Sequence, residues 1–261
     1  MRYIDINSDL GESFGNYKLG DTAAILDIIS SANLACGFHA GDPMVMDKTV
    51  EMCVEKGVVI GAHVGYPDLQ GFGRRKMDLS FDEIYNFTLY QLGALEAFTR
   101  VHNTKIRHVN GHGALGNLSH KDDKVAHAIV KAAHDFDPSL LIAAPRESSC
   151  MVKYAREYGM GIISNLFHID RNYEEDLSLV PRGTPKAMIE DENYALERVI
   201  RAVKERRVYA VTGKDIEIAP PKRVLIHGDQ TKALLFAKKL RDSLEAEGIG
   251  ICYCADMPEE Q

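Results

Sequence analysis

Short apolar runs alternate with longer amphipathic segments along almost the whole chain. Runs of about 4–8 apolar residues are typical of buried strands, whereas apolar residues spaced by three or four over ten or more positions indicate helices. The predicted strands cover residues 3–7, 32–35, 58–60, 106–109, 140–143, 161–164 and 224–226. The predicted helices cover residues 22–30, 43–56, 81–102, 121–134, 148–158, 192–205 and 231–247. Residues 208–218 predict two more short strands around Thr212-Gly213.

Two helix starts carry specific end signals. Asp42 followed by Pro43 places an N-cap residue before a proline at the first helical position. Ser80 and Glu83 have the spacing of a capping box. These signals strengthen the helices predicted to follow them.

The alternation of strands and helices predicts an α/β fold with a parallel sheet. About seven strand–helix units follow one another, and no Pro/Ser-rich linker or break in composition separates them. We therefore expect one domain over residues 1–261, built as a single (β/α)7 barrel of the TIM type. An open doubly wound sheet is the alternative.

Composition narrows the class of protein. The 261 residues carry a formal net charge of −7, which disfavours nucleic acid as the main partner. The sequence predicts no membrane span, because no stretch approaches about 20 apolar residues, and the N-terminus lacks the apolar core of a signal peptide. Five cysteines without a CxxC pair fit a reducing cytoplasm.

Acids, histidines and glycines gather in the segments that follow the predicted strands. In a βα barrel these loops meet at one face, where active sites lie. Glycines in the same loops allow a close approach of backbone to ligand. The sequence therefore predicts one cleft assembled from distant residues. The polar residues concerned are Asp9, Glu12, His39, Asp42, His63, Asp68, His112, Asp170, Arg171, His227 and Asp229.

Several chemistries are open to these side chains. Asp9 and Glu12 could act as general base and metal ligand, or could cap the following segment. His39, His63 and His112 could bind a metal, transfer protons, or hydrogen-bond a phosphate or carbonyl oxygen. The candidate metal ligands are Asp9, His39, His63 and His112. A metal site would have to be assembled across strands, since no HxxxH or HExxH spacing occurs.

Nucleotide-binding motifs are missing from the sequence. Gly213-Lys214 lacks the upstream glycine and the following Ser/Thr of a phosphate loop, and no GxGxxG follows a strand. If ATP takes part, we expect it to use an unfamiliar site or a partner.

The loop motifs together resemble those of the LamB/YcsF family over nearly the whole chain. The first motif is DINSDLGESFG at residues 5–15, the second SANLACGFHAGDP at 31–43 and the third GAHVGYPD at 61–68 with GFGRR at 71–75. Shorter matches are QLGAL at 91–95, HGAL at 112–115, DRNY at 170–173, LVPR at 179–182 and HGD at 227–229.

This resemblance implies ATP-dependent opening of the 5-oxoproline lactam to L-glutamate by the A subunit of a multi-subunit 5-oxoprolinase. It also implies partner subunits B and C, ATP with Mg²⁺ bound here or by those partners, and a seven-stranded barrel similar to that of polysaccharide deacetylases.

The chain departs from the family pattern near the fourth motif, which usually reads HVKPHGALYN. Asn110, Gly111 and Gly116 replace the usual lysine, proline and tyrosine. Asn165 replaces a usual glutamate, and Lys186 a usual glycine. We expect such departures to alter the substrate or lower the activity.

The leading prediction is a cytoplasmic hydrolase of a small cyclic amide. Asp9 or Glu12 would activate water, His39, His63 and His112 would stabilise charge or hold a metal, and Asp229 would orient a histidine. A metal-dependent deacetylase of an N-acetylated sugar or amine is one alternative, and a non-catalytic protein that binds the substrate for its partners is another. The predicted substrate-binding residues are Asn33, Arg74, Arg75, Asn117, Arg171 and Arg182.

Overall fold

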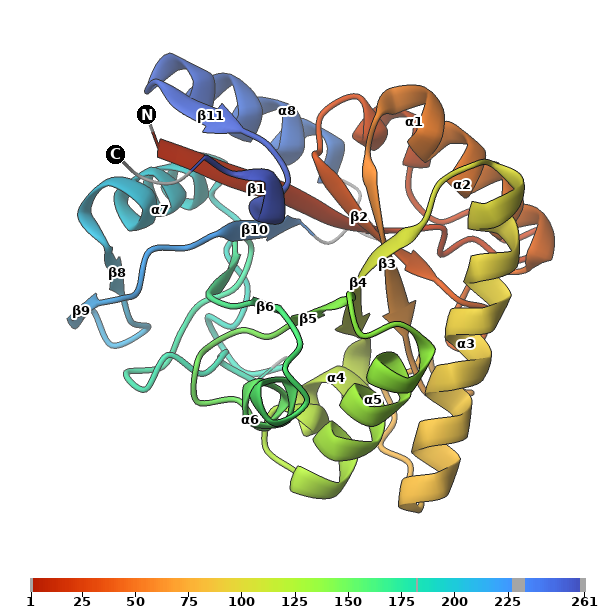
Figure 1. Ribbon diagram of the computed structural model, residues 1–261. Coiled ribbons are helices and arrows are strands. Elements are labelled where there is room, and N and C mark those ends of the chain that lie inside the picture. Colours follow the sequence, from red (N-terminus) through yellow and green to blue (C-terminus); the bar gives the residue numbers. More distant parts are fainter. Residues whose placement is uncertain (1, 182, 227–232, 259–261) are drawn as a thin grey trace.

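The computed structural model describes residues 2–181, 183–226 and 233–258. Within them, eight parallel strands follow one another in the order β6-β5-β4-β3-β2-β1-β10-β7 (Figure 1). The predicted α/β barrel is confirmed. The strands are β1 (Arg2–Leu10), β2 (Ser31–Ala35), β3 (Val59–Val64), β4 (Ile106–Gly111), β5 (Leu141–Ala143), β6 (Ile162–Ile163), β7 (Leu166–His168) and β10 (Arg223–Ile226).

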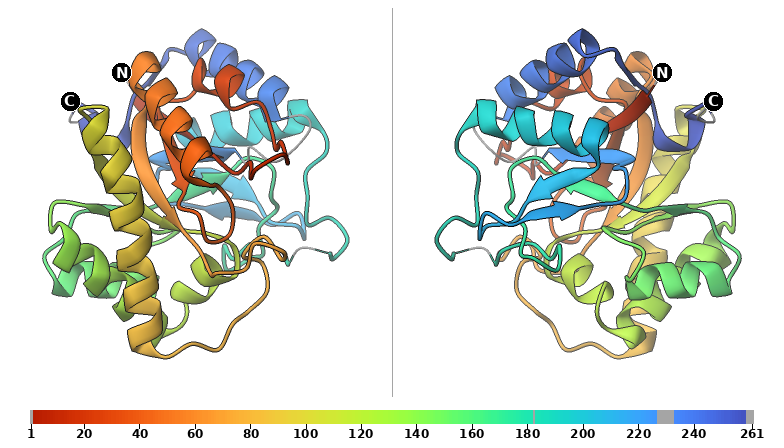
Figure 2. Two further views of the ribbon diagram at one scale, coloured as in Figure 1. Left: turned by 90° about the vertical axis from the view of Figure 1, so that its right-hand side faces the viewer. Right: turned by 90° about the vertical axis from the view of Figure 1, so that its left-hand side faces the viewer.

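Helices cover the outside of these strands, as the two turned views show (Figure 2). Asp42 accepts from the backbone N–H groups of Met44 and Val45, and Ser80 with Glu83 forms the predicted capping box. The helices are α1 (Thr22–Leu26), α2 (Pro43–Lys56), α3 (Phe81–Val101), α4 (Gly113–Ser119), α5 (Asp123–Phe136), α6 (Cys150–Glu157), α7 (Glu192–Glu205) and α8 (Ala233–Ala246), with the short 3₁₀ helix η1 (Cys254–Asp256). None of the helices in these ranges is both long and apolar enough to cross a membrane.

The barrel is nearly closed, and β6 and β7 are the two ends of the strand order. Only Ser164 and Asn165 separate these strands along the chain. Asn165 has a positive φ of 62°, so the chain turns directly after the strand predicted at 161–164, and β7 follows as a strand that was not predicted. If β6 and β7 are taken as halves of one broken strand, the path contains the seven strands expected.

Other elements differ from the prediction. The first helix ends at Leu26 instead of residue 30, because the Ser30 hydroxyl bonds the Asp5 carboxylate and β2 starts at Ser31. Helix α4 and strand β11 (Ile249–Ile251), which pairs with the start of β1, were not predicted. The two strands expected at 208–218 are an antiparallel hairpin of β8 (Arg207–Tyr209) and β9 (Asp215–Glu217).

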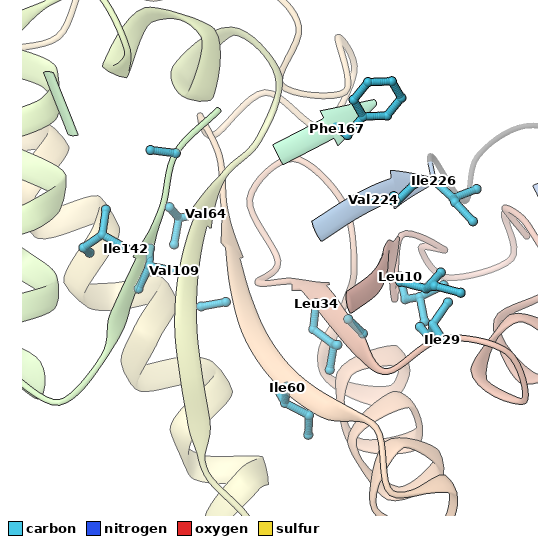
Figure 3. Close-up of a cluster of buried hydrophobic side chains, with 14 of the residues drawn as sticks. Leu10, Ile29, Leu34, Ile60, Val64, Val109, Ile142, Phe167, Val224 and Ile226 are labelled. Carbon is cyan, nitrogen blue, oxygen red and sulfur yellow. The ribbon is translucent and has the colours of Figure 1, made fainter. Parts of the chain in front are cut away.

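Side chains of β1 alternate between two environments. Ile4, Ile6 and Leu10 belong to the hydrophobic core that also contains side chains of the helices. Asp5 and Asn7, in contrast, hydrogen-bond to polar side chains of β2. Figure 3 shows apolar side chains contributed to this core by β1, β2, β3, β4, β5, β7 and β10. The strands therefore present their apolar side chains to the helices and polar side chains to the barrel interior.

Candidate active site

A buried group of one carboxylate and three imidazoles lies at the carboxyl ends of the first four strands. Glu12 follows β1, His39 follows β2, His63 is on β3 and His112 follows β4. All four side chains are buried, and one donor atom of each lies within 4.8 Å of those of the others. We call Glu12, His39, His63 and His112 the four-residue cluster.

The cluster is packed by direct contacts between its members. The Glu12 Oε1 atom lies 3.4 Å from His39 Nε2 and 3.7 Å from His112 Nδ1. The rings of His39 and His112 are stacked, with centroids 3.7 Å apart and planes 5° from parallel. Three imidazoles therefore converge on a single carboxylate.

Backbone carbonyls fix the tautomers of two of these histidines. His63 Nδ1 lies 3.2 Å from the Asn110 carbonyl oxygen, and His112 Nε2 lies 2.8 Å from that of Phe72. Each of these nitrogens must carry a hydrogen, because a carbonyl only accepts. The other two nitrogens, His63 Nε2 and His112 Nδ1, face each other at 3.0 Å. Two neutral imidazoles would thus oppose two lone pairs, so either a proton or a metal cation must lie between them.

The pKa values follow this arrangement. Burial and the neighbouring His63 lower the pKa of His112 to about 3. Burial, together with His112 and His63, holds the pKa of His39 well below its usual range. Burial would also lower the pKa of His63, but the Asp9 carboxylate raises it above its usual value. Without a metal, His63 therefore carries the shared proton.

His39 is held in place by close packing. Neither ring nitrogen has a hydrogen-bond partner among the described residues, and the residue is fully buried. A Cβ at Gly65 would come within 2.5 Å of His39 Nδ1, and one at Gly73 within 2.8 Å of the His39 Cβ. The glycines of the third motif thus leave room for the His39 ring.

Replacing Gly65 by alanine should displace His39 without straining the backbone, since Gly65 does not have a positive φ. We expect the affinity for a divalent cation such as Zn²⁺ to fall by roughly tenfold or more, as expected for a misplaced ligand. Calorimetric titration measures this. Gly93→Ala is the control, because nothing lies within 4 Å of a Cβ there and alanine favours a helix. Unchanged affinity in Gly65→Ala would show that His39 is not a ligand.

Acid should destabilise the metal-free protein. The pKa of His112 is lowered to about 3 and that of His120 to about 4, both mainly by burial, and the pKa values of His39 and His108 are also lowered. Below about pH 6.5 these histidines bind protons in the unfolded chain but stay neutral in the folded protein. The free energy of unfolding should therefore fall by about 1.4 kcal/mol per pH unit for each histidine. His63, whose pKa is raised, opposes this trend.

Urea unfolding of chelator-treated protein at pH 7.5 and pH 5 measures this dependence. A free energy of unfolding that rises on acidification would contradict the neutral, buried state of these histidines.

Asp9, at the end of β1, lies beside the four-residue cluster, and polar side chains of the barrel interior hold its carboxylate in place. Its Oδ1 accepts a hydrogen bond of 2.8 Å from Asn33 Nδ2 and lies 3.5 Å from His63 Nε2. The Asn33 Oδ1 atom lies 2.8 Å from His108 Nε2, and His108 Nδ1 lies 3.3 Å from the Tyr253 hydroxyl. This chain of buried groups orients the Asp9 carboxylate from the barrel interior.

A buried ion pair lies deeper in the barrel. Arg223 Nε donates to Asp5 Oδ2 over 2.7 Å, and both side chains are almost completely excluded from solvent. The hydroxyls of Ser30 and Ser31 also donate to Asp5. The polar interior therefore continues from Asp9 down to the carboxylate of Asp5.

A cavity of about 600 Å³ opens above the cluster. Asp9, Glu12, His63 and His112 contribute to its lining, together with Phe72. Its cationic lining residues are Arg74, Lys121, Arg146 and Arg171, and Asn110, Asn117, His120 and His168 add polar groups.

The structure brings most of the predicted site residues that it describes to the cluster or the cavity, and places others elsewhere. Asp9, Glu12, His39, His63 and His112 are brought together, and Arg74, Asn117 and Arg171 line the cavity. Asn33 is fully buried beneath Asp9, so it supports that carboxylate instead of lining the cavity. Arg75 also differs from the prediction, because its guanidinium pairs with Asp68 and is not part of the lining. Arg182, His227 and Asp229 lie outside the described residues.

The family departures have visible local consequences. Gly111 and Gly116 approach each other so closely that a Cβ at Gly111 would lie 2.8 Å from the Gly116 Cα atom. Asn110 and Gly116 line the cavity, where the family pattern has a lysine and a tyrosine. Lys186 has a positive φ of 62°, a conformation that suits the glycine usual there.

Sequence reasoning missed the cavity residues Lys121, Arg146 and His168. Arg146 follows β5, so the rule that places functional side chains after strands would have found it.

Comparisons with known proteins agree with this geometry. The LamB/YcsF family model matches residues 4–259. A relative from Campylobacter jejuni subsp. doylei, named as the A subunit of 5-oxoprolinase, is 47% identical over 252 residues, which are 97% of this chain and 98% of that protein.

Solved structures show the same barrel. A lactam utilization protein from Thermus thermophilus superposes with a TM-score of 0.90 at 36% identity, over 96% of this chain and 99% of that one. The catalytic domain of a peptidoglycan N-acetylglucosamine deacetylase from Eubacterium rectale shares the fold, with a TM-score of 0.51 at 11% identity, over 100% of this chain and 93% of that one. The chain belongs to the LamB/YcsF family.

Proposed function

We propose that this chain hydrolyses the lactam of 5-oxoproline to L-glutamate, as the A subunit of a cytoplasmic, ATP-dependent 5-oxoprolinase. The observation that carries the proposal is the four-residue cluster beside Asp9, opening into a cavity with arginines in its lining. The 47% identity to a protein named as the A subunit of 5-oxoprolinase supports the substrate.

A divalent metal ion fits the four-residue cluster. His63 Nε2 and His112 Nδ1 face each other with their lone pairs, and His39 has two buried nitrogens without hydrogen-bond partners among the described residues. Glu12 adds a carboxylate, and one carboxylate with imidazoles suits zinc or a similar borderline metal. When bound, such an ion would supply Lewis-acid polarisation of the lactam carbonyl.

Asp9 is the proposed general base, held by Asn33 at the edge of the cavity. It takes a proton from the water whose oxygen bonds to the lactam carbonyl carbon. The carbon–nitrogen bond then breaks, and Asp9 gives the proton it took from water to the ring nitrogen, which becomes the amine of glutamate. Arg74, stacked over Phe72 at 4.9 Å, is placed to bind the substrate carboxylate.

ATP and the partner subunits complete the proposal. Hydrolysis of this resonance-stabilised lactam is uphill, so ATP supplies the free energy. The chain lacks a recognisable phosphate loop. ATP with Mg²⁺ is therefore proposed to bind subunits B and C.

Glutamate release from 5-oxoproline tests the proposal, using this chain with and without candidate subunits B and C, and with and without ATP. We expect release only when ATP and all subunits are present. Acetate release from an N-acetylated sugar by this chain alone would instead indicate a deacetylase, the reaction named for the barrel relative.

A further inference from the structure

The cavity has two chemically different halves. The carboxyl ends of β1 to β4 and the loops after them contribute the four-residue cluster and Asp9. The other half is formed by the turn between α4 and α5, the loop after β5 and the segment after β7, and it contributes Lys121, Arg146 and Arg171. Among the described residues that line the cavity, Asp9 and Glu12 are the only acids. The second half is therefore cationic, in a chain whose net charge is −7.

Two of these cations have no carboxylate within ion-pair distance among the described residues. Among the described residues, neither Lys121 nor Arg146 forms an ion pair within 4 Å. Arg146 Nη1 donates to the backbone carbonyl of Asp176 over 2.9 Å, which orients the guanidinium. Hydrogen bonds lower the pKa of the Asp176 carboxyl, and Arg146 and Lys121 lower it further, so this carboxylate offsets part of their charge without forming an ion pair with either. Glu147, the acid next to Arg146 in sequence, pairs with Arg156.

A neutral imidazole lies beside these two cations. We call the part of the cavity formed by Lys121, Arg146 and His120 the corner. His120 precedes Lys121, and its Nδ1 lies 3.0 Å from Ser149 Oγ at the start of α6. His120 also lines the cavity. Burial, reinforced by the charges of Arg146 and Lys121, lowers the pKa of His120 to about 4. At neutral pH the corner therefore offers two cations and an uncharged imidazole.

The cavity is larger than 5-oxoproline needs. Its volume of about 600 Å³ is in the range of pockets that hold drug-sized ligands, about 300–1,000 Å³. A lactam of roughly nine non-hydrogen atoms fills only a fraction of such a pocket. In the proposed function its carboxylate binds Arg74, whose Cγ would lie 3.6 Å from a Cβ at Gly113, directly after His112. Lys121 and Arg146, in the other half of the cavity, are therefore available to bind a second anionic group.

We infer that Lys121 and Arg146 form a second anion-binding subsite, which takes the phosphate group of a small phosphorylated ligand. Phosphate suits the corner because its charge at neutral pH is close to −2 and its oxygens accept several hydrogen bonds. An arginine and a lysine together are a common phosphate-binding pair. The inference rests on the proposed function only for the placement of the reacting bond at the four-residue cluster.

Binding of inorganic phosphate to chelator-treated protein tests the subsite without turnover. Removal of metal ensures that phosphate does not report on the four-residue cluster. The test variant is the double substitution Lys121→Met and Arg146→Met. The control is Lys105→Met with Arg100→Met, because both residues are exposed and lie outside the cavity lining. Titrations are run at constant ionic strength, with acetate and 5-oxoproline as parallel ligands.

We expect phosphate to bind the unaltered protein and the control equally, and to bind the test variant at least roughly tenfold more weakly, since two charged partners are lost. Affinity for 5-oxoproline should change little. Equal phosphate binding by the test variant would overturn the inference, as would no phosphate binding at all. Loss of 5-oxoproline or acetate affinity without loss of phosphate affinity would also overturn it, and would assign the corner to the substrate carboxylate. If the reconstituted complex released no glutamate from 5-oxoproline, the proposed function would fail, but the phosphate-binding result would remain valid.

Discussion

Replacing His63 by alanine should abolish both divalent metal binding and turnover while the barrel stays folded. His63 Nε2 faces His112 Nδ1 at 3.0 Å and lies 3.5 Å from Asp9, so its removal leaves the cluster without its central imidazole. Loss of an outer-shell partner alone typically costs about 10–100-fold in metal affinity, and loss of a ligand should cost more. Elemental analysis and calorimetric titration with Zn²⁺ measure the metal.

His134→Ala is the matched control, because this histidine is on α5, makes a surface contact with Asp135, and is not part of the cluster. Circular dichroism and thermal melting of the metal-free proteins should place both variants near the unaltered chain. If His63→Ala keeps its metal and its turnover, the cluster is not the reactive centre.

Replacing Arg223 by methionine should be the most destabilising single change in the barrel interior. The Asp5 carboxylate would stay fully buried, with serine hydroxyls and the Cys254 thiol but no cation as partners among the described residues. Breaking a buried ion pair from one side typically costs about 3–5 kcal/mol. Urea unfolding should show this decrease in the free energy of unfolding.

A double variant distinguishes the effect of leaving the Asp5 charge buried without a cation from the other effects of replacing Arg223. Asp5→Asn combined with Arg223→Met removes the isolated charge and keeps an acceptor for Ser31, so we expect it to be more stable than Arg223→Met alone. Lys153→Met breaks an exposed ion pair with Asp123 and should change stability little. A small effect of Arg223→Met, comparable to that of Lys153→Met, would show that water reaches Asp5.

Much of the barrel could be predicted because its signals are local. Asp42 before Pro43, and Ser80 with Glu83, mark helix starts through contacts within one turn. The broken strand at Asn165 and the pairing of β11 with β1 could not be predicted in this way. They depend on a turn in the backbone and on pairing between residues far apart in sequence.

The candidate site likewise contains residues whose place could be predicted from the sequence and residues whose place could not. Asp9, His39 and His63 could be placed together because barrel loops share one face. The role of Asn33 could not be predicted, because on a strand the direction of a side chain decides whether it reaches the cavity or lies beneath it. The pairing of Arg75 with Asp68 likewise depends on how one loop folds back on itself.

In the proposed function this chain performs the hydrolysis and does not merely bind the substrate. Asp9→Asn tests it most directly, because the amide keeps the shape of the side chain and an oxygen for Asn33 but cannot act as a base. The measurement is the rate of glutamate release from 5-oxoproline by the complex reconstituted with subunits B and C and ATP. We predict a loss of about 10²–10⁴-fold, the usual contribution of a general base. Release at the unaltered rate would contradict the account and leave this chain with a binding role alone.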